Sequence, residues 1–272
     1  MKSVYIKSMI APLMREPKAN SERVDEVLHG MMIFLLEEIG DWYYISTEYN
    51  YNGYIHRKDI YDMGNRDMKL SKCKKAYLYQ SFADIMSEPN IKSPVITSIT
   101  RGSILYTTGK LYEKGYVGVR LGNGEEGYIK ESYLINYEQT INSSEQLRMQ
   151  LVHTACSYLG SPYRWGGKSL CGIDCSGLCQ MAYMLNGITI FRDSRIHPEF
   201  IVKSIPQEDK KPGDLLYFPG HIAMYIGEER YVHATAKEGS DGVVINSLSP
   251  TQPNYRKDLA NSLYAVGSIF YE

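Results

Sequence analysis

The first half of the chain contains two copies of one sequence unit, and this repeat limits the folds that the chain can adopt. The segment 11–17 (Ala-Pro-Leu-Met-Arg-Glu-Pro) matches the segment 83–89 (Ala-Asp-Ile-Met-Ser-Glu-Pro). Because such repeats are structural units, the sequence predicts two similar small domains. Further matched positions are Gly30 with Gly102, and Gly53-Tyr54-Ile55 with Gly127-Tyr128-Ile129.

Both copies are rich in residues that favour β-strands. Runs such as 42–46 and 116–120 combine aromatic and β-branched side chains, and Gly, Asn and Asp turns separate them. The pattern predicts one small β-barrel per copy. The copies resemble bacterial SH3-like domains over most of residues 8–62 and 76–136. Two roles are open for them, as spacers or cell-wall anchors and as direct contributors to an active site.

From Ser143 onward the apolar residues follow the spacing of an α-helix. One helix is expected behind the possible cap Ser144 and before Gly160, and a second is expected to start near Asp174 and to stop at Gly187. The apolar positions of the two helices are Leu147, Leu151, Ala155 and Leu159, then Leu178, Ala182 and Leu185.

Strand-like alternation returns after Pro212-Gly213, in the runs 215–218, 221–226 and 231–234. Helices followed by an antiparallel sheet indicate an α+β domain. The predicted fold class is therefore multidomain, with all-β barrels at residues 1–68 and 69–140 and an α+β domain at residues 141–272.

Composition excludes several classes of function. The 30 basic and 31 acidic residues give a net charge of −1, so we expect no nucleic-acid partner and no attraction to an anionic membrane. No apolar run approaches the roughly 18 residues of a membrane span. The N-terminal 17 residues lack the apolar core of a signal peptide, so we expect a cytoplasmic protein. The odd number of cysteines, 5, predicts reduced thiols.

The run Asp174-Cys175-Ser176-Gly177 has the features of a nucleophile at a helix start. The helix dipole and the unpaired N–H groups there are expected to lower the pKa of Cys175 from about 8.5. Asp174 would be the N-cap, and the Cys175 N–H would point toward a substrate oxyanion. Ser176 and Gly177 are small and would leave the approach open.

His221 and His233 are the candidate base and orienting residue. They lie on one face of the sheet only if the turn around residues 227–230 has an odd number of loop residues. A two-residue loop would put them on opposite faces, whereas a three-residue loop would pair 223 with 233 and make them diagonal neighbours. We predict the three-residue loop, with His233 holding one nitrogen of His221 while the other meets Cys175.

The same residues have plainer interpretations. A cysteine on an amphipathic helix is usually a core residue, and a histidine on a strand is usually structural. A metal site built from Cys171, Cys175 and Cys179 is the rival, but spacings of four differ from the two-residue gap of zinc knuckles. We therefore expect no metal and no cofactor.

Five motifs occur together in the second half of the chain. They are Tyr158–Gly167, Gly172–Leu178, Pro212–Phe218, His221–Gly227 and Tyr231–Ala234. In this order and spacing they resemble the NlpC-family cysteine peptidases, over residues 145–270. The resemblance implies a papain-like catalytic domain of the NlpC type, with Cys175 as nucleophile, His221 as base and His233 as orienting residue.

Two SH3-like domains before such a domain resemble the dipeptidyl-peptidase VI branch of the family. These γ-D-glutamyl-L-diamino-acid endopeptidases trim murein peptides during cell-wall recycling. The resemblance implies cleavage of L-Ala-γ-D-Glu-diamino acid peptides with a free N-terminal L-Ala, between γ-D-Glu and diaminopimelate or Lys. The oxyanion and substrate-binding residues that it implies are Tyr163, Trp165, Asp174, Ser176 and Ser194, with Glu22 and Tyr51 from the first barrel.

Selection for a free amine needs a carboxylate in a closed pocket, since an unpaired buried ammonium is costly. Asp174 and Glu22 are the candidates. Two other hypotheses compete: an exported enzyme that cuts intact peptidoglycan with the barrels as wall anchors, and an inactive or acyltransferase relative. The preferred diamino acid and the oligomeric state are left open.

Overall fold

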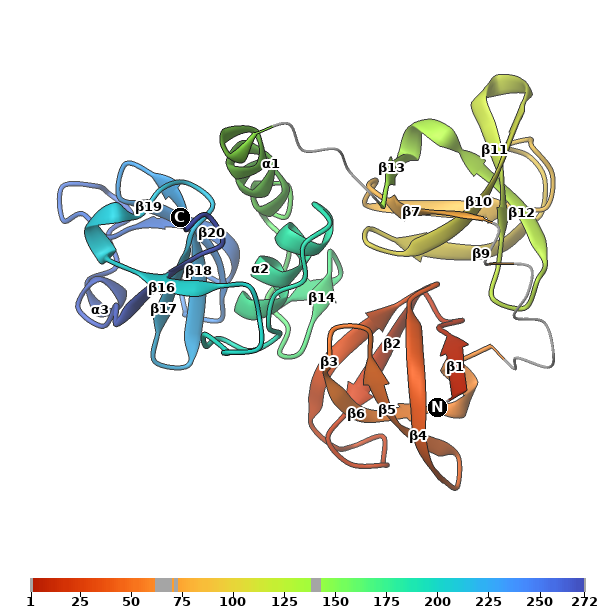
Figure 1. Ribbon diagram of the computed structural model, residues 1–272, viewed down its shortest axis with the longest axis horizontal. Helices are drawn as coiled ribbons and strands as arrows, with labels where there is room; N and C mark the ends of the chain where they lie inside the picture. The colour runs from red at the N-terminus through yellow and green to blue at the C-terminus, as the bar shows by residue number, and fades with distance from the viewer. Residues whose placement is uncertain (1, 62–69, 71–72, 138–142, 272) are drawn as a thin grey trace. The chain divides into compact units, whose positions relative to one another are not determined.

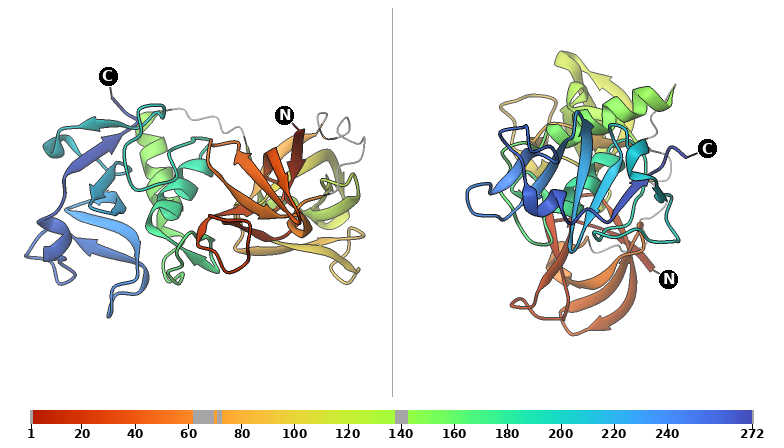
Figure 2. Two further views of the ribbon diagram at one scale, coloured as in Figure 1. Left: turned by 90° about the horizontal axis from the view of Figure 1, so that it is seen from below. Right: turned by 90° about the vertical axis from the view of Figure 1, so that its left-hand side faces the viewer.

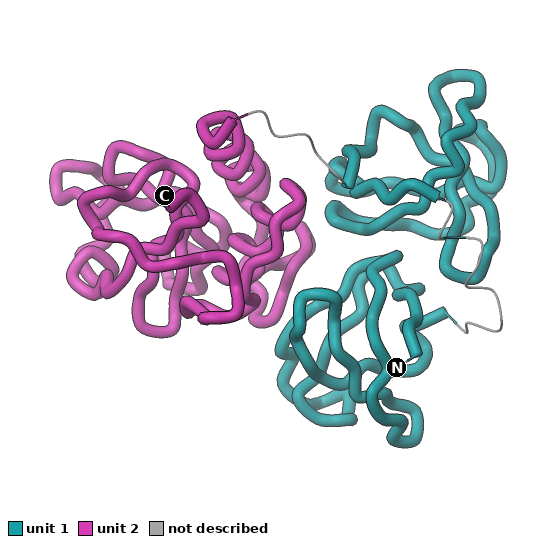
Figure 3. The backbone as a smooth tube through the Cα atoms, in the orientation of Figure 1, with its two compact units in different colours: residues 1–138 teal, residues 139–272 magenta. Residues whose placement is uncertain are grey.

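The fold is described from a computed structural model, which covers residues 2–61, 70, 73–137 and 143–271. The predicted domain boundaries, 68/69 and 140/141, lie outside these residues. The chain forms two compact units, Met1–Glu138 and Gln139–Glu272 (Figure 3). Each unit is described by itself.

The first unit consists of β-strands joined by turns and short 3-10 helices. Its strands fall into two groups, here called the first β module (residues 2–61) and the second β module (residues 73–137). The first contains β1 (Lys2–Tyr5), β2 (Ile10–Met14), β3 (Arg23–Leu28), β4 (Met32–Ile39), β5 (Trp42–Thr47) and β6 (Asn52–His56). The second contains β7 (Lys74–Leu78), β8 (Phe82–Met86), β9 (Val95–Thr100), β10 (Ile104–Tyr112), β11 (Tyr116–Arg120), β12 (Glu126–Lys130) and β13 (Leu134–Asn136).

The two β modules share one topology, as the sequence repeat predicts. The strand order is β1-β4-β5-β6-β2-β3 in the first and β7-β10-β11-β12-β8-β9 in the second, where β13 adds to the edge at β7. Both carry a register shift in the repeated segment, at Leu13/Met14 and at Ile85/Met86. The repeated residues therefore build the same strand pairs in both copies.

The repeated glycine of Gly-Tyr-Ile allows a close approach in both modules. A Cβ on Gly53 would lie 2.7 Å from the Leu13 side chain, and one on Gly127 would lie 2.4 Å from the Ile85 side chain. Any larger residue would clash with these side chains unless they moved. This packing explains why the motif recurs at the same place in each copy.

The second unit contains two helices that pack on one face of an antiparallel sheet. Its helices are α1 (Ser144–Cys156), α2 (Cys175–Met184) and α3 (Lys257–Ala260). Its strands are β14 (Lys168–Ser169), β15 (Gly172–Ile173), β16 (Lys203–Ile205), β17 (Leu215–Phe218), β18 (His221–Gly227), β19 (Arg230–Thr235), β20 (Gly242–Ser247) and β21 (Ala265–Ser268). The main sheet has the order β16-β21-β17-β18-β19-β20.

Different helices pack on the two faces of this sheet. α1 and α2 lie on one side of strands β17–β20, and α3 lies on the other (Figures 1 and 2). On the α3 side, Leu259 packs into a buried apolar cluster with Phe218 and Tyr231 of the sheet. The order of helices first and antiparallel sheet second is as predicted, and the described part of the chain is mostly β with few helices.

The helix predictions hold with two corrections, at the start and at the end of α1. α1 is capped by Ser143, whose hydroxyl accepts from the Gln146 N–H at 3.2 Å, and not by Ser144. It ends at Cys156, so Leu159 lies beyond the helix and is 46% exposed. The other predicted apolar positions of both helices are buried. None of the described helices is long and apolar enough to cross a membrane.

Candidate active site

The predicted nucleophile opens a buried helix. Cys175 is the first residue of α2 and is only 7% exposed. Asp174 is the N-cap, as predicted, and accepts the Gly177 N–H at 2.6 Å. The first N–H groups of a helix have no partner within it. In the described part of the chain the Cys175 N–H donates to no other residue, so it can serve an incoming oxygen.

The carboxylate of Asp174 is fully occupied by neighbouring donors. One oxygen accepts from the N–H of Gly177 and from the Ser176 hydroxyl, and the other accepts from the Gly166 N–H at 2.9 Å. The Arg192 guanidinium binds both oxygens, at 3.0 and 2.9 Å, and also donates to the Ser176 oxygen at 2.6 Å. Arg192 is 1% exposed. This geometry gives no support to Asp174 as the receptor of a substrate ammonium.

Burial controls the protonation of the nucleophile. It raises the pKa of the Cys175 thiol to about 11, and the charge of Asp174 acts in the same direction. The N–H groups of Ile222 and Ser176, and the cation of Arg192, lower this pKa but do not outweigh burial. The prediction of a lowered pKa is wrong, because burial destabilises the thiolate by more than the N–H groups at the helix start stabilise it. The resting thiol is protonated and needs a base.

The turn between the two histidine strands is not the predicted one. β18 and β19 are joined by a two-residue turn of Glu228 and Glu229, with Gly227 paired to Arg230. Both glutamates have positive φ, 53° and 58°, as a type I′ turn requires. The strand pairing shifts by one residue at Ile226, which forms a β-bulge. The prediction of a three-residue loop is therefore wrong.

The bulge nevertheless produces the predicted pairing. Met224 pairs with Val232, so Ala223 stands opposite His233, and His221 is the diagonal neighbour of His233 on the same face. The two imidazoles are in contact, with 2.7 Å between His221 Nε2 and His233 Nδ1. The prediction that both histidines share one face is confirmed.

A chain of hydrogen bonds assigns the tautomer of each histidine. The Asn246 Nδ2 donates to the Asn254 carbonyl at 2.9 Å, which leaves Asn246 Oδ1 as an acceptor toward His233 Nε2, also at 2.9 Å. His233 therefore carries its proton on Nε2 and accepts at Nδ1. His221 must then donate from Nε2, so its Nδ1 holds a lone pair. This lone pair is what a general base requires.

Both imidazoles are neutral at physiological pH. Burial, and then the cation of Arg256, lowers the pKa of His221 to about 4. Burial, and then His221, lowers the pKa of His233 to about 3. With the protonated thiol of Cys175, the resting site holds a neutral cysteine and a neutral base, so a proton must pass from the thiol to the base for the sulfur to act as a nucleophile.

Comparisons with known proteins identify the family of the chain. The profile of the NlpC/P60 family matches residues 160–260. The chain is 42% identical over 268 residues to dipeptidyl-peptidase 6 of Lysinibacillus sphaericus, covering 97% of this chain and 98% of that protein.

The chain belongs to the NlpC/P60 family. It is also 27% identical over 256 residues to a γ-D-glutamyl-L-lysine dipeptidyl-peptidase of Bacillus subtilis, which covers 86% of this chain and 78% of that protein. A crystal structure of an NlpC/P60 family protein from Bacillus cereus has the same fold, with a TM-score of 0.80 at 19% identity over 97% of this chain and 98% of that one. NlpC/P60 proteins are cysteine peptidases, in agreement with the cysteine and histidines described above.

Three further predicted residues of the NlpC/P60 domain lie on its loops. Tyr163 forms a parallel bridge with Ile173 just before α2. Burial, and then the charge of the Cys175 thiolate, raises the pKa of the Tyr163 phenol. Trp165 is 61% exposed, and Ser194 is partly buried in the loop after α2. Their predicted contacts with substrate stay predictions.

The two residues predicted from the first barrel lie in the other unit. Glu22 is exposed and forms an ion pair with Arg15 at 2.7 Å. Tyr51 lies in the turn between β5 and β6, where its N–H donates to Thr47 Oγ1 at 3.0 Å. Their predicted role in binding substrate stays a prediction.

Two positioning residues escaped the sequence analysis. Arg192 lies in the run Phe191-Arg192-Asp193-Ser194, of which only Ser194 was assigned a role. Asn246 interrupts the apolar run 243–245 at the end of β20, which is the one signal that the sequence offers for it. Neither residue type is diagnostic, because a buried arginine or asparagine is recognised by its partners and not by its spacing.

The cysteines of the rival metal site do not share one environment. Cys179 is fully buried in α2 and Cys171 is exposed. Over the residues that the structure covers, no group of three or more His, Cys, Asp or Glu side chains is arranged to hold a metal ion.

Proposed function

We propose that the chain is a cysteine endopeptidase that hydrolyses the bond between γ-D-glutamate and a diamino acid in murein peptides with a free N-terminal L-Ala. The observation that carries this proposal is the near full-length identity of 42% to a dipeptidyl-peptidase 6. That match includes both β modules as well as the catalytic domain. The contact between His221 and His233 supports a working catalytic group.

The proposed reaction has two steps. The Cys175 sulfur attacks the γ-carbonyl carbon of D-glutamate while its proton passes to Nδ1 of His221, and that proton then goes to the nitrogen of the leaving diamino acid as the amide bond breaks. Water next attacks the thioester carbon and gives one proton to His221. The C–S bond then breaks, the sulfur takes that proton from His221, and the glutamyl carboxylic acid loses its remaining proton to solvent.

Two donors are proposed for the oxyanion that forms in each step. One is the N–H of Cys175, which donates to nothing else in the described part of the chain. The other is the Tyr163 phenol, whose pKa is raised by burial and by Cys175, so it stays protonated and can donate. These donors would stabilise the charge on the former carbonyl oxygen.

Recognition of the free N-terminal amine is proposed to involve the first β module. The Asp174 carboxylate is neutralised by Arg192, which leaves an external carboxylate as the partner for an ammonium. Glu22, which is ion-paired with Arg15 in this structure, is the proposed source, and Tyr51 is the second proposed contact. In this proposal both β modules are SH3-like barrels, and the enzyme acts in the cytoplasm on recycled murein peptides.

The test uses three substrates: L-Ala-γ-D-Glu-diaminopimelate, its N-acetylated form, and intact sacculi. The proposal expects release of diaminopimelate from the free peptide only, and no release by Cys175→Ala. Glu22→Gln should raise KM for the free peptide, whereas the matched change Glu16→Gln, at another ion-paired glutamate of the same β module, should not. Release from sacculi would contradict the recycling role and favour a wall hydrolase.

A further inference from the structure

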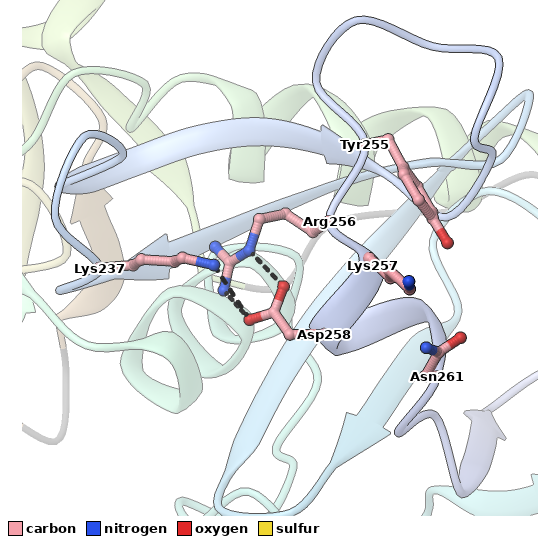
Figure 4. A pocket seen from close by; sticks show the side chains of 6 residues that line it. All are labelled: Lys237, Tyr255, Arg256, Lys257, Asp258 and Asn261. Carbon is pink, nitrogen blue, oxygen red and sulfur yellow. Dashed lines mark hydrogen bonds and ion pairs between the residues drawn. The ribbon is translucent and has the colours of Figure 1, made fainter.

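A basic pocket lies on the α3 side of the sheet, outside the residues assigned so far. It has a volume of about 580 Å³. In Figure 4 the ion pair of Arg256 and Asp258 stands between Lys237 on one side and Lys257 with Asn261 on the other. The lining residues, here called the basic pocket, are Lys237, Tyr255, Arg256, Lys257, Asp258 and Asn261.

The charge of the basic pocket is positive. Three cations line it and one carboxylate, Asp258, faces them. That carboxylate is already bound by Arg256, at 2.7 and 2.8 Å, and by Lys237 at 3.3 Å. Lys257 is exposed, and within the described residues its ammonium forms no ion pair. The excess charge is therefore available to an anion, and no carboxylate is left over for a cation.

The basic pocket is tied to the catalytic histidines through backbone and side-chain contacts. Asn254 is bonded to Asn246, which is bonded to His233. Two residues after Asn254, the Arg256 N–H donates to the Ser247 carbonyl at 3.0 Å, which fixes this segment along the edge of β20. The cation of Arg256 also lowers the pKa of both catalytic histidines.

We propose that the basic pocket is the subsite for the leaving diamino acid and binds the carboxylates of that residue. This inference rests on the proposed function. His221 must reach the nitrogen of the leaving residue, so a pocket beside the histidines receives what is attached to that nitrogen. The end of a lysine side chain carries a charge of +1, whereas the end of a diaminopimelate side chain carries both an ammonium and a carboxylate. A pocket with excess positive charge selects diaminopimelate over lysine.

The test compares leaving residues in wild type and in the double variant Lys237→Gln/Lys257→Gln. The substrates are L-Ala-γ-D-Glu peptides that end in meso-diaminopimelate, in L-lysine, and in L-lysine amide. We expect wild type to prefer diaminopimelate, and we expect the double variant to lose about tenfold in kcat/KM on it. On the lysine amide the loss should be less than twofold. Added salt should reduce the difference in wild type, because these charges are exposed.

Lys211→Gln is the control for the loss of an exposed positive charge elsewhere in the domain, and it removes one charge where the double variant removes two. Lys211 lies before the first residue of β17, whereas His221 pairs with its last residue, Phe218. Lys211 is therefore at the opposite end of the strand from His221. This variant should leave all three values of kcat/KM unchanged. Equal losses on the charged and the amidated substrates, or an equal loss in Lys211→Gln, would overturn the subsite.

Direct binding separates failure of the subsite from failure of the proposed function. Isothermal titration calorimetry with free meso-diaminopimelate and with L-lysine reports on the basic pocket even if no peptide is cleaved. Tighter binding of diaminopimelate that is lost in the double variant supports the pocket, whatever the enzyme hydrolyses. No difference between the two amino acids, with wild-type cleavage of the peptides intact, refutes the pocket and leaves the proposed function standing.

Discussion

Replacing Asn246 by leucine removes the acceptor that holds the catalytic histidines in one tautomer. Asn246 Oδ1 lies 2.9 Å from His233 Nε2, and both residues are buried. Without this acceptor, the His233 proton is no longer confined to Nε2. If the proton moves to Nδ1, the Nε2–H of His221 loses its partner, and His221 no longer needs to keep Nδ1 free for the thiol.

The size of the effect follows from the hydrogen bond that is lost. Leaving a buried donor without a partner costs about 1–3 kcal/mol. This corresponds to a fall of about 5- to 150-fold in the population of the productive tautomer. We expect kcat/KM for the free murein peptide to fall by a factor in this range, with the fold intact.

The assay needs a readout that a loss of stability would not move. Long-range proton–nitrogen correlation spectra of protein labelled at histidine nitrogens report the tautomer of His221 and His233 directly. In Asn246→Asp the acceptor remains and gains a negative charge, so the pKa of the histidine pair should rise and the acid limb of the pH–rate profile should move to higher pH. Leucine should reduce the rate without that displacement.

Asn186→Leu is the matched control for the stability cost. Asn186 is also a buried asparagine of this domain, but it donates to Thr154 and to the Ala182 carbonyl. It should lower the melting temperature without changing the tautomers. A wild-type tautomer and wild-type kcat/KM in Asn246→Leu would refute the reasoning, and so would an equal loss of activity in Asn186→Leu.

Two further predictions concern charge in the site. Arg192→Met should leave the Asp174 carboxylate buried without its cation and lower the free energy of unfolding by about 3–5 kcal/mol. It should also raise the pKa of Cys175, which would shift the pH dependence of thiol alkylation to higher pH. An unshifted alkylation profile would contradict this. The pKa values of His221 and His233, about 4 and 3, lie below the usual 6.5, so the unfolded chain takes up protons first. The free energy of unfolding should therefore fall as the pH drops from about 6.5 to 3 and change little through these residues above 6.5, which urea titrations at several pH values can check.

Much of the fold was open to sequence reasoning because its signals are local. The repeat predicts two modules of one kind, and both copies have the same strand order and the same register shift near Met14 and Met86. The apolar spacing predicts α2. Asp174 predicts its cap, because capping depends only on this side chain and the N–H groups next to it. SH3-like character of the modules stays a prediction.

The histidine hairpin shows where local signals end. The sequence shows that the number of residues in the turn decides whether His221 and His233 lie on one face. It does not show which turn forms. Two glutamates in a turn that favours Asn and Gly carry no signal for its type. The packing of both strands in the sheet determines both the turn and the bulge at Ile226. The two-residue turn alone would put the histidines on opposite faces, and the extra residue of the bulge returns them to one face.

By itself, the sequence determined which residues could do the chemistry, because the order and spacing of Cys175, His221 and His233 are properties of the chain. Only the tertiary structure decided their protonation and their partners. Burial raises the pKa of Cys175 and lowers those of the histidines, and burial depends on what other segments cover. Arg192 and Asn246 acquire their roles in the same way, since each acts on a residue that is distant in sequence and adjacent in space.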